Sequence, residues 1–156
     1  NASKEYPSVV FFSYREKTRS TSFDFLLMSI LKAGFAITGL WPVRSSISKK
    51  QDDLVRVAVV FRKREAKGMA TTRRGFINAL KRQLPAMLDD AYEDDTLEED
   101  QRIIGIGMGM QIFTEFHKIM NADGTPLSLP DALWLIQQEV REYCHIHAAV
   151  EQIEEE

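Results

Sequence analysis

The sequence predicts an α/β fold, with a small β-sheet in residues 1–66 and an α-helical region in residues 67–156 that packs on it as one compact unit. Runs of β-branched and aromatic residues at 8–14, 35–41 and 54–64 are typical of strands. Between the first two runs, apolar residues recur every three or four positions over 22–33, which predicts an amphipathic helix. A strand, a helix and a strand in this order form a right-handed unit whose two strands are parallel.

Residues 22–44 organise the rest of the predicted sheet. Thr21 or Ser22 can cap the helix, and Gly34 can end it in a left-handed conformation. Pro42 cannot donate a ladder hydrogen bond, so the strand should end at Trp41-Pro42. The connection to 54–64 is too short for a crossover helix, and we therefore expect 54–64 to pair antiparallel with 35–41 or beside it.

The pattern beyond residue 65 is helical. Thr71 or Thr72 can cap a helix that continues to residue 88, in which Pro85 should cause a kink or a break. A second helix should start at 97 or 98, be interrupted by its glycines and resume over 110–120. Ser128 and Asp131 form a capping box that opens a last helix, predicted to run almost to the end of the chain.

Charge divides the chain sharply although the net charge is only -3. Residues 44–82 hold twelve Lys and Arg against three acids, whereas residues 83–156 hold three against seventeen. A nucleic-acid partner should therefore contact the middle of the chain. No apolar run reaches the ~20 residues of a membrane span, and the start of the chain has no signal-peptide pattern. With Cys144 as the only cysteine, these features predict a cytoplasmic protein that does not associate with membranes.

Several phrases of the sequence carry a resemblance to a known family. They are SFDFLLMSILKAGFAITGLWPVR (22–44), VRVAVVFRKR (55–64), FINALKRQLPAML (76–88), IGIGMGMQIFTEF (104–116) and NADGTPLSLPDALWLI (121–136). Together they resemble the C-terminal part of a family of adenine-specific DNA methylases, which are large proteins with an N-terminal domain of unknown function. One departure is Phe23, where the family usually has Trp.

This resemblance implies a partial methyltransferase (Rossmann-like) sheet of three mixed strands with the order 8–14, 54–64, 35–41. The outer edge of 8–14 would be bare where a missing strand should pair. The family's Gly-rich loop for S-adenosylmethionine and its Asp-Pro-Pro-Tyr motif do not occur in this chain. The resemblance therefore implies a C-terminal fragment with no catalytic residues of its own, inactive alone and not expected to bind S-adenosylmethionine. Its implied partners are the missing N-terminal catalytic region and, in the parent protein, DNA. A separate alternative is a complete small α/β protein that acts as a homodimer, with the bare edge of 8–14 paired to a second copy.

Tyr14, Trp41 and Pro42 are the candidate substrate-binding residues, because they stand at the carboxyl ends of two strands. Enzymes that modify a base in duplex DNA extrude it and stack it on aromatic groups, a role that Trp41 could have. The alternatives are a core tryptophan beside a strand-ending proline, and a tyrosine that only caps the sheet edge.

The candidate contacts to DNA phosphates are basic residues on both sides of the third strand: Arg44, Lys49, Lys50, Arg73 and Arg74. Lys81 and Arg82 could extend the path, and a solvated basic face is the alternative.

Other motifs support no chemistry. Cys144, His145 and His147 lack a second ligand pair, so we expect no metal site. The glycines at 105, 107 and 109 follow no strand, so they should serve close helix packing rather than nucleotide binding. The alternative function is a non-catalytic interaction module whose acidic helical tail recruits a partner within a defence or restriction-type complex.

Overall fold

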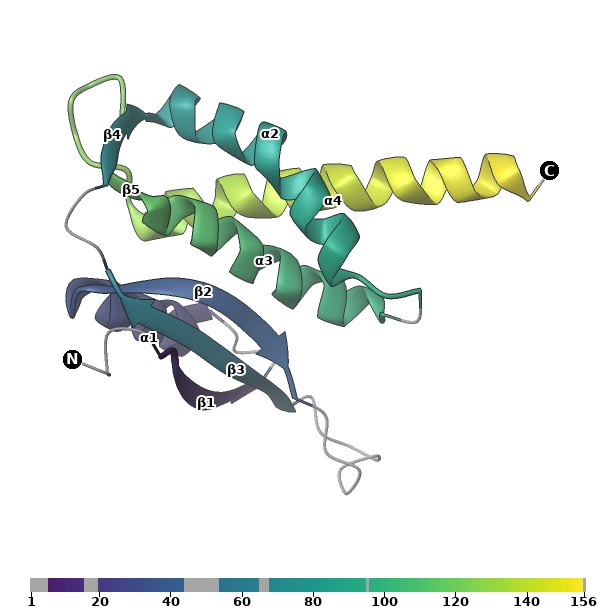
Figure 1. Cartoon of the computed structure of the whole chain (residues 1–156), viewed down its shortest axis with the longest axis horizontal. Helices are drawn as coiled ribbons and strands as arrows, with labels where there is room; N and C mark the ends of the chain where they lie inside the picture. The colour runs from purple at the N-terminus through teal and green to yellow at the C-terminus, as the bar shows by residue number, and fades with distance from the viewer. Residues whose placement is uncertain (1–5, 16–19, 44–53, 65–67, 95, 156) are drawn as a thin grey trace.

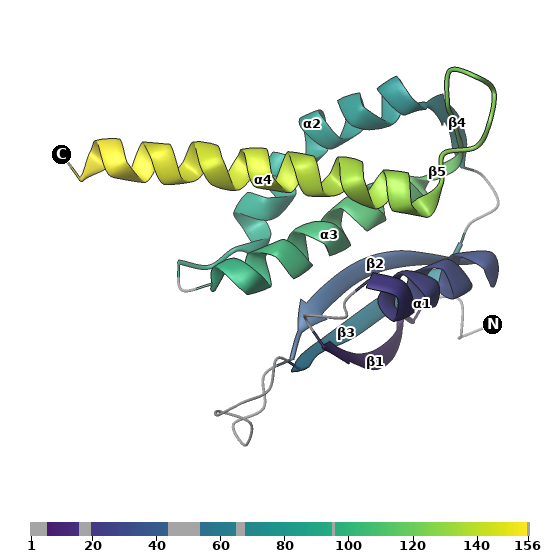
Figure 2. The same ribbon diagram turned by 180° about the vertical axis from the view of Figure 1, so that it is seen from behind.

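The computed structural model describes residues 6–15, 20–43, 54–64, 68–94 and 96–155. Its elements in chain order are β1 (Ser8–Arg15), α1 (Ser20–Lys32), β2 (Phe35–Pro42), β3 (Leu54–Lys63), β4 (Met69–Thr72), α2 (Arg73–Ala91), α3 (Glu98–Glu115), β5 (Phe116–Met120) and α4 (Leu129–Glu154). In Figure 1 the sheet of β1, β2 and β3 lies below the helices α2, α3 and α4, while Figure 2 shows α1 against the back of that sheet. The α/β class predicted from the sequence is confirmed.

The three-stranded sheet has the order β1-β3-β2, with β3 antiparallel to both neighbours. This is the predicted order, and β1 and β2 run in the same direction on either side of β3. Every neighbouring pair is antiparallel, however, so the description of the sheet as mixed was wrong. The co-directional strands of the strand-helix-strand unit are separated by β3, which takes the hydrogen bonds of both.

One face of this sheet is covered by α1 and contains the local core. Residues paired across an antiparallel ladder share a face, so Val59 lies beside Val10 and Leu40 on this side. Leu40 and Val59 are completely buried, as is Leu27 of α1. The ring of Phe12 lies 5.8 Å from that of Phe23, which brings α1 onto the same face.

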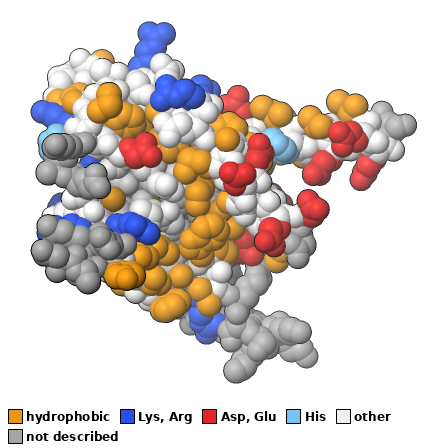
Figure 3. Space-filling model, in the orientation of Figure 1, with side chains coloured by type: hydrophobic (Ala, Val, Ile, Leu, Met, Phe, Trp, Pro, Cys, Tyr) orange, Lys and Arg blue, Asp and Glu red, His pale blue; other side chains and the backbone are white. Residues whose placement is uncertain are grey.

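The opposite face of the sheet has no helix over it in the described part of the chain. It carries Val9 and Phe11 of β1, Ala58 of β3 and Trp41 of β2. Phe11 is 73% exposed and Val9 is also exposed. This face points toward the viewer in Figure 1, and the space-filling view of Figure 3 shows hydrophobic side chains gathered on it.

The edge of β2 that pairs with no described strand is covered by α3. The Thr114 hydroxyl donates to the carbonyl oxygen of Ile37 at 3.3 Å. A Cβ added at Gly107 would overlap the backbone nitrogen of Leu40 and lie 3.0 Å from its Cβ. The glycines thus permit close packing, as predicted. The prediction that they interrupt the helix was wrong, because α3 is continuous. Every residue from 104 to 110 is buried, and this burial offsets a helix-propensity cost of ~1 kcal/mol per glycine.

The predicted end of α1 and the predicted starts of α2 and α4 are confirmed, but α1 begins at Ser20, so Thr21 and Ser22 lie inside the helix and the prediction that one of them caps it was wrong. Gly34 follows α1 with a φ of 92°, and the Thr72 hydroxyl accepts from Gly75 N at 3.1 Å at the start of α2. Ser128 accepts from Asp131 N at 3.2 Å at the start of α4. Of the two outcomes predicted at Pro85, a kink or a break, the break does not occur: α2 continues to Ala91 with Leu84 and Leu88 buried in its inner face.

A second, two-stranded sheet was not predicted. β4 and β5 pair in parallel, with Thr71 opposite Ile119. The prediction that 110–120 is helical was therefore wrong at its end, since α3 stops at Glu115. Ile119 is buried in this small sheet, and its pairing partner lies 48 positions earlier in the chain, where no local pattern could indicate it.

Candidate ligand cleft and charged surfaces

An open cleft of about 560 Å³ lies where β2 ends against the helical region. Its lining comes from β2, the end of α2, the connection between α2 and α3, and the first turns of α3: Trp41, Pro42, Ala91, Glu93, Thr96, Leu97, Asp100 and Ile104. Two of the three predicted substrate-binding residues therefore contribute to one concave surface. The other lining residues were not predicted, because they meet β2 only after α3 packs on its edge.

Trp41 is a surface residue of this cleft. Its side chain is 39% exposed, so the alternative of a core tryptophan does not hold. The indole lies over Gly39, where an added Cβ would be 2.7 Å from the indole Nε1. Glycine at 39 is thus what allows the ring to lie back against the strand.

Carboxylates dominate the charge of the cleft. Glu93 and Asp100 are among its lining residues, and the described lining includes no Lys or Arg. Carboxylate oxygens accept hydrogen bonds, and an aromatic face favours a planar or cationic group. This surface therefore suits a planar ligand that carries N–H donors, and it disfavours phosphate.

Tyr14, the third predicted substrate-binding residue, has its backbone at the same end of the sheet. It pairs with Val55, while Pro42 pairs with Val57 two positions further along β3. Its side chain lies outside the described residues. Arg44, Lys49 and Lys50, three of the predicted phosphate contacts, also lie outside them.

Arg73 and Arg74 are described and exposed, in the first turn of α2. The cleft is at the other end of this helix, where Ala91 contributes to it. Nineteen residues at 1.5 Å per residue separate the two ends by about 28 Å. Arg73 and Arg74 are therefore not adjacent to Trp41 and Pro42, two of the predicted base-binding residues. Figure 3 shows the same separation, with Lys and Arg mainly on one side and most Asp and Glu on the other.

Two other basic residues have structural roles. The Lys81 ammonium lies 3.0 Å from a carboxylate oxygen of Glu139 and 3.6 Å from one of Glu142, both on α4. The hydrogen bond to Glu139 raises the pKa of Lys81, which stays positive but is neutralised by its partners. The Arg64 guanidinium donates to the carbonyl oxygen of Phe116 and so joins the sheet to β5. Lys81 is thus a poor extension of a phosphate path.

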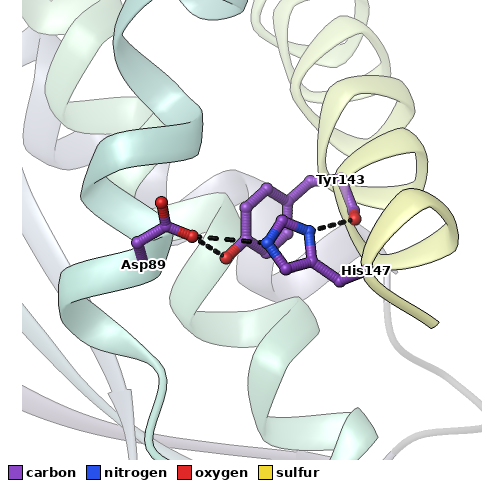
Figure 4. A network of polar contacts seen from close by, with 3 residues as sticks. All are labelled: Asp89, Tyr143 and His147. Carbon is purple, nitrogen blue, oxygen red and sulfur yellow. Dashed lines mark hydrogen bonds and ion pairs between the residues drawn. The ribbon is translucent and has the colours of Figure 1, made fainter. Parts of the chain in front are cut away.

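A polar cluster between α2 and α4 was not predicted (Figure 4). The Tyr143 hydroxyl donates to Oδ1 of Asp89, and Nε2 of His147 lies 3.5 Å from the same oxygen. The rings of Tyr143 and His147 stack with centroids 4.0 Å apart. The only signal in the sequence was their spacing of four on a helix, because Asp89 comes from a distant segment. The cluster holds the helices together and includes no nucleophile.

Cys144 lies beside this cluster as a neutral thiol. Burial, with a smaller contribution from the charge of Glu98, raises the pKa of its thiol. Its sulfur lies 3.7 Å from the side-chain oxygen of Gln101. Within the described ranges, no group of three or more His, Cys, Asp or Glu side chains is arranged to hold a metal ion. A neutral, half-buried thiol is neither a good nucleophile nor a good metal ligand.

We predict that Tyr92 and Tyr143 remain protonated at pH 10 in the folded protein. Burial raises the pKa of each phenol well above the ordinary value for tyrosine. The hydrogen bond to Asp89 raises the pKa of Tyr143 further. Because the folded state holds these protons more tightly than the unfolded state, the stabilisation is complete below about pH 10 and is lost as the pH rises further. Phenolate absorbance, followed with circular dichroism, should show a late ionisation step that coincides with unfolding.

The matched control is the double variant Tyr92→Phe with Tyr143→Phe, in which the late step should be absent. Ionisation of every tyrosine near pH 10 with an unchanged circular dichroism spectrum would contradict the prediction.

Comparison with protein-family models, with curated proteins and with solved structures gives no match for this chain. None of the described helices is both long enough and apolar enough to cross a membrane.

Proposed function

We propose that this chain is the C-terminal part of an S-adenosylmethionine-dependent adenine-specific DNA methyltransferase, in which it supplies the last strands of the catalytic sheet. The observation that carries the proposal is the open sheet. Within the described part of the chain, the outer edge of β1 has no pairing strand, and Phe11 beside it is 73% exposed.

Exposed apolar strands at a sheet edge promote aggregation, so proteins usually cover or pair them. Sheets of α/β proteins have helices on both faces, whereas here only the α1 face is covered. A further strand beside β1, with helices over Val9 and Phe11, would complete such a sheet. The order β1-β3-β2, with an antiparallel strand between two co-directional ones, supports placement at the end of a methyltransferase sheet.

In this proposal the cleft receives the target base. The indole of Trp41 would stack on the adenine, and Glu93 or Asp100 would accept a hydrogen bond from its exocyclic amine. Residues upstream of this chain would hold S-adenosylmethionine, which supplies the methyl group. The basic side of the molecule, including Arg73 and Arg74, would contact phosphates several base pairs from the flipped base.

The product of the full reading frame tests this proposal through transfer of labelled methyl groups from S-adenosylmethionine to adenine in duplex DNA. Trp41→Ala should reduce the transfer about tenfold or more, as expected for loss of base stacking. The control is Trp134→Ala, since Trp134 is exposed on α4 and does not line the cleft. That variant should keep its activity within about twofold, because exposed substitutions away from a site have small effects.

Three results would overturn the proposal. The full-length product could transfer no methyl group to adenine, or the chain alone could bind S-adenosylmethionine with micromolar affinity in calorimetry. The third is a stable dimer of the full-length product that Phe11→Arg dissociates, because a second copy would then cover the bare sheet.

A further inference from the structure

The C-terminal half of α4 extends beyond the rest of the protein. The helix has 26 residues and is therefore about 39 Å long. Its buried residues end at Val140, Tyr143 and Cys144 are half-buried, and every described residue from His145 onward is exposed. Figures 1 and 2 both show this part of α4 projecting past α2 and α3. We call residues 145–155 the projecting arm.

The apolar stripe that anchors α4 continues along the projecting arm. One apolar position recurs every seven residues, at Leu129, Ile136, Tyr143 and Val150. The second apolar position of the heptad, three residues further on, is occupied by Ile146 and Ile153. This heptad spacing gives one continuous seam for packing against another helix. The first half of the seam is buried in the protein, but Ile146, Val150 and Ile153 are 53%, 47% and 73% exposed.

The charges beside the seam select the kind of partner. Residues 142–156 include five Glu and no Lys, Arg or Asp. Glu154 stands at a heptad position that flanks a helix-helix seam and sets partner choice, whereas Glu142, at the other flanking position, already lies 3.6 Å from the Lys81 ammonium. Figure 3 shows hydrophobic side chains along one edge of the projecting arm and acidic ones along the other.

Two other occupants fit these charges poorly. A second copy of α4 would bring glutamates together in a seam that has no basic residue to offset them. An anionic membrane surface attracts basic amphipathic helices and repels this acidic one. The complementary occupant is a helix with its own apolar seam and with Lys or Arg at the flanking positions.

We propose that the exposed seam of Ile146, Val150 and Ile153 docks a basic amphipathic helix of another protein. The contact extends the packing that already holds α4 to the body of the molecule, and the glutamates confer the preference for a basic partner. This docking uses neither the cleft nor the sheet face, so it holds or fails independently of methyl transfer.

A labelled synthetic peptide of three heptads, with Ile and Leu at the seam positions and Lys at the flanking positions, serves as the probe in fluorescence anisotropy. It should bind the protein with a Kd of about micromolar order and more weakly as salt rises. The triple variant Ile146→Ser, Val150→Ser, Ile153→Ser should raise the Kd about tenfold or more. A peptide with Glu in place of Lys should bind the native protein more weakly by a similar factor. Circular dichroism of each variant verifies that α4 remains helical.

The matched control is Ala148→Ser with Gln152→Ser, which changes exposed residues on the opposite side of the same arm and should leave the Kd unchanged. Equal binding of a peptide with the same composition in scrambled order would overturn the proposal. So would unchanged binding by the triple variant, or a protein dimer that the triple variant dissociates. Sedimentation of the protein with anionic phospholipid vesicles, lost in the triple variant, would instead assign the seam to a membrane.

Discussion

Phe76→Ala is expected to lower the free energy of unfolding by about 3–5 kcal/mol, the usual cost of removing a fully buried phenylalanine. Phe76 is completely buried on α2. Its ring packs edge-on against Phe113 of α3, with centroids 5.6 Å apart, and against Phe116 of β5 at 6.4 Å. The truncation therefore leaves a cavity where three elements meet.

Denaturant unfolding followed by circular dichroism and by tryptophan fluorescence measures this effect. The control is Phe25→Ala, the same truncation on the exposed side of α1, which should change stability by no more than about 0.5 kcal/mol. If the sheet and the helical region unfold as one unit, the two signals should shift together in Phe76→Ala. A comparable loss in both variants would contradict the central place given to Phe76.

Gly107→Ala is expected to destabilise the protein by about 2 kcal/mol, although alanine normally stabilises a helix interior. The added Cβ would overlap the backbone nitrogen of Leu40, and a strand backbone cannot move aside as a side chain can. The helix α3 would have to shift away from the edge of β2, and the bond from Thr114 to Ile37 would weaken with it.

Gly105→Ala is the matched control on the same helix. There the added Cβ would meet the two methyl groups of Val140, at 2.7 and 2.8 Å, rather than a strand backbone. We expect Gly105→Ala to lower the free energy of unfolding less than Gly107→Ala does. When Gly105→Ala is combined with Val140→Ala, the stability of the double variant should return toward that of Val140→Ala alone. Thermal unfolding of the four variants measures the coupling. Equal or greater stability of Gly107→Ala relative to the native chain would show that α3 does not depend on close contact with β2.

The placement of charge links the two proposals. The cleft and the projecting arm are both acidic and lie on the same side of the molecule, away from Arg73 and Arg74. DNA would therefore approach from the basic side, while a basic protein partner would approach the acidic arm. The two partners need not compete for one surface.

Local signals in the sequence were sufficient for much of the fold. The three strands of the main sheet followed from their composition, and the ends of the helices followed from Gly34, Thr72 and Ser128. These signals are readable because a cap or a turn depends on residues within one helical turn of each other. The order of the strands came from the family resemblance together with the short connection before β3.

What the sequence alone determined about this protein is thus the identity of its main strands and helices, the close packing of its glycines and its division into a basic middle and an acidic end. Only the tertiary structure decided that β4 pairs with β5, that α2 and α3 continue through Pro85 and Gly107, and that Glu93 and Asp100 line the same cleft as Trp41. It also decided that Lys81 is neutralised by α4, and that Asp89 meets Tyr143 and His147. These features join residues that are distant in the chain, or depend on burial by distant segments. The contacts that stabilise them therefore leave no local pattern in the sequence.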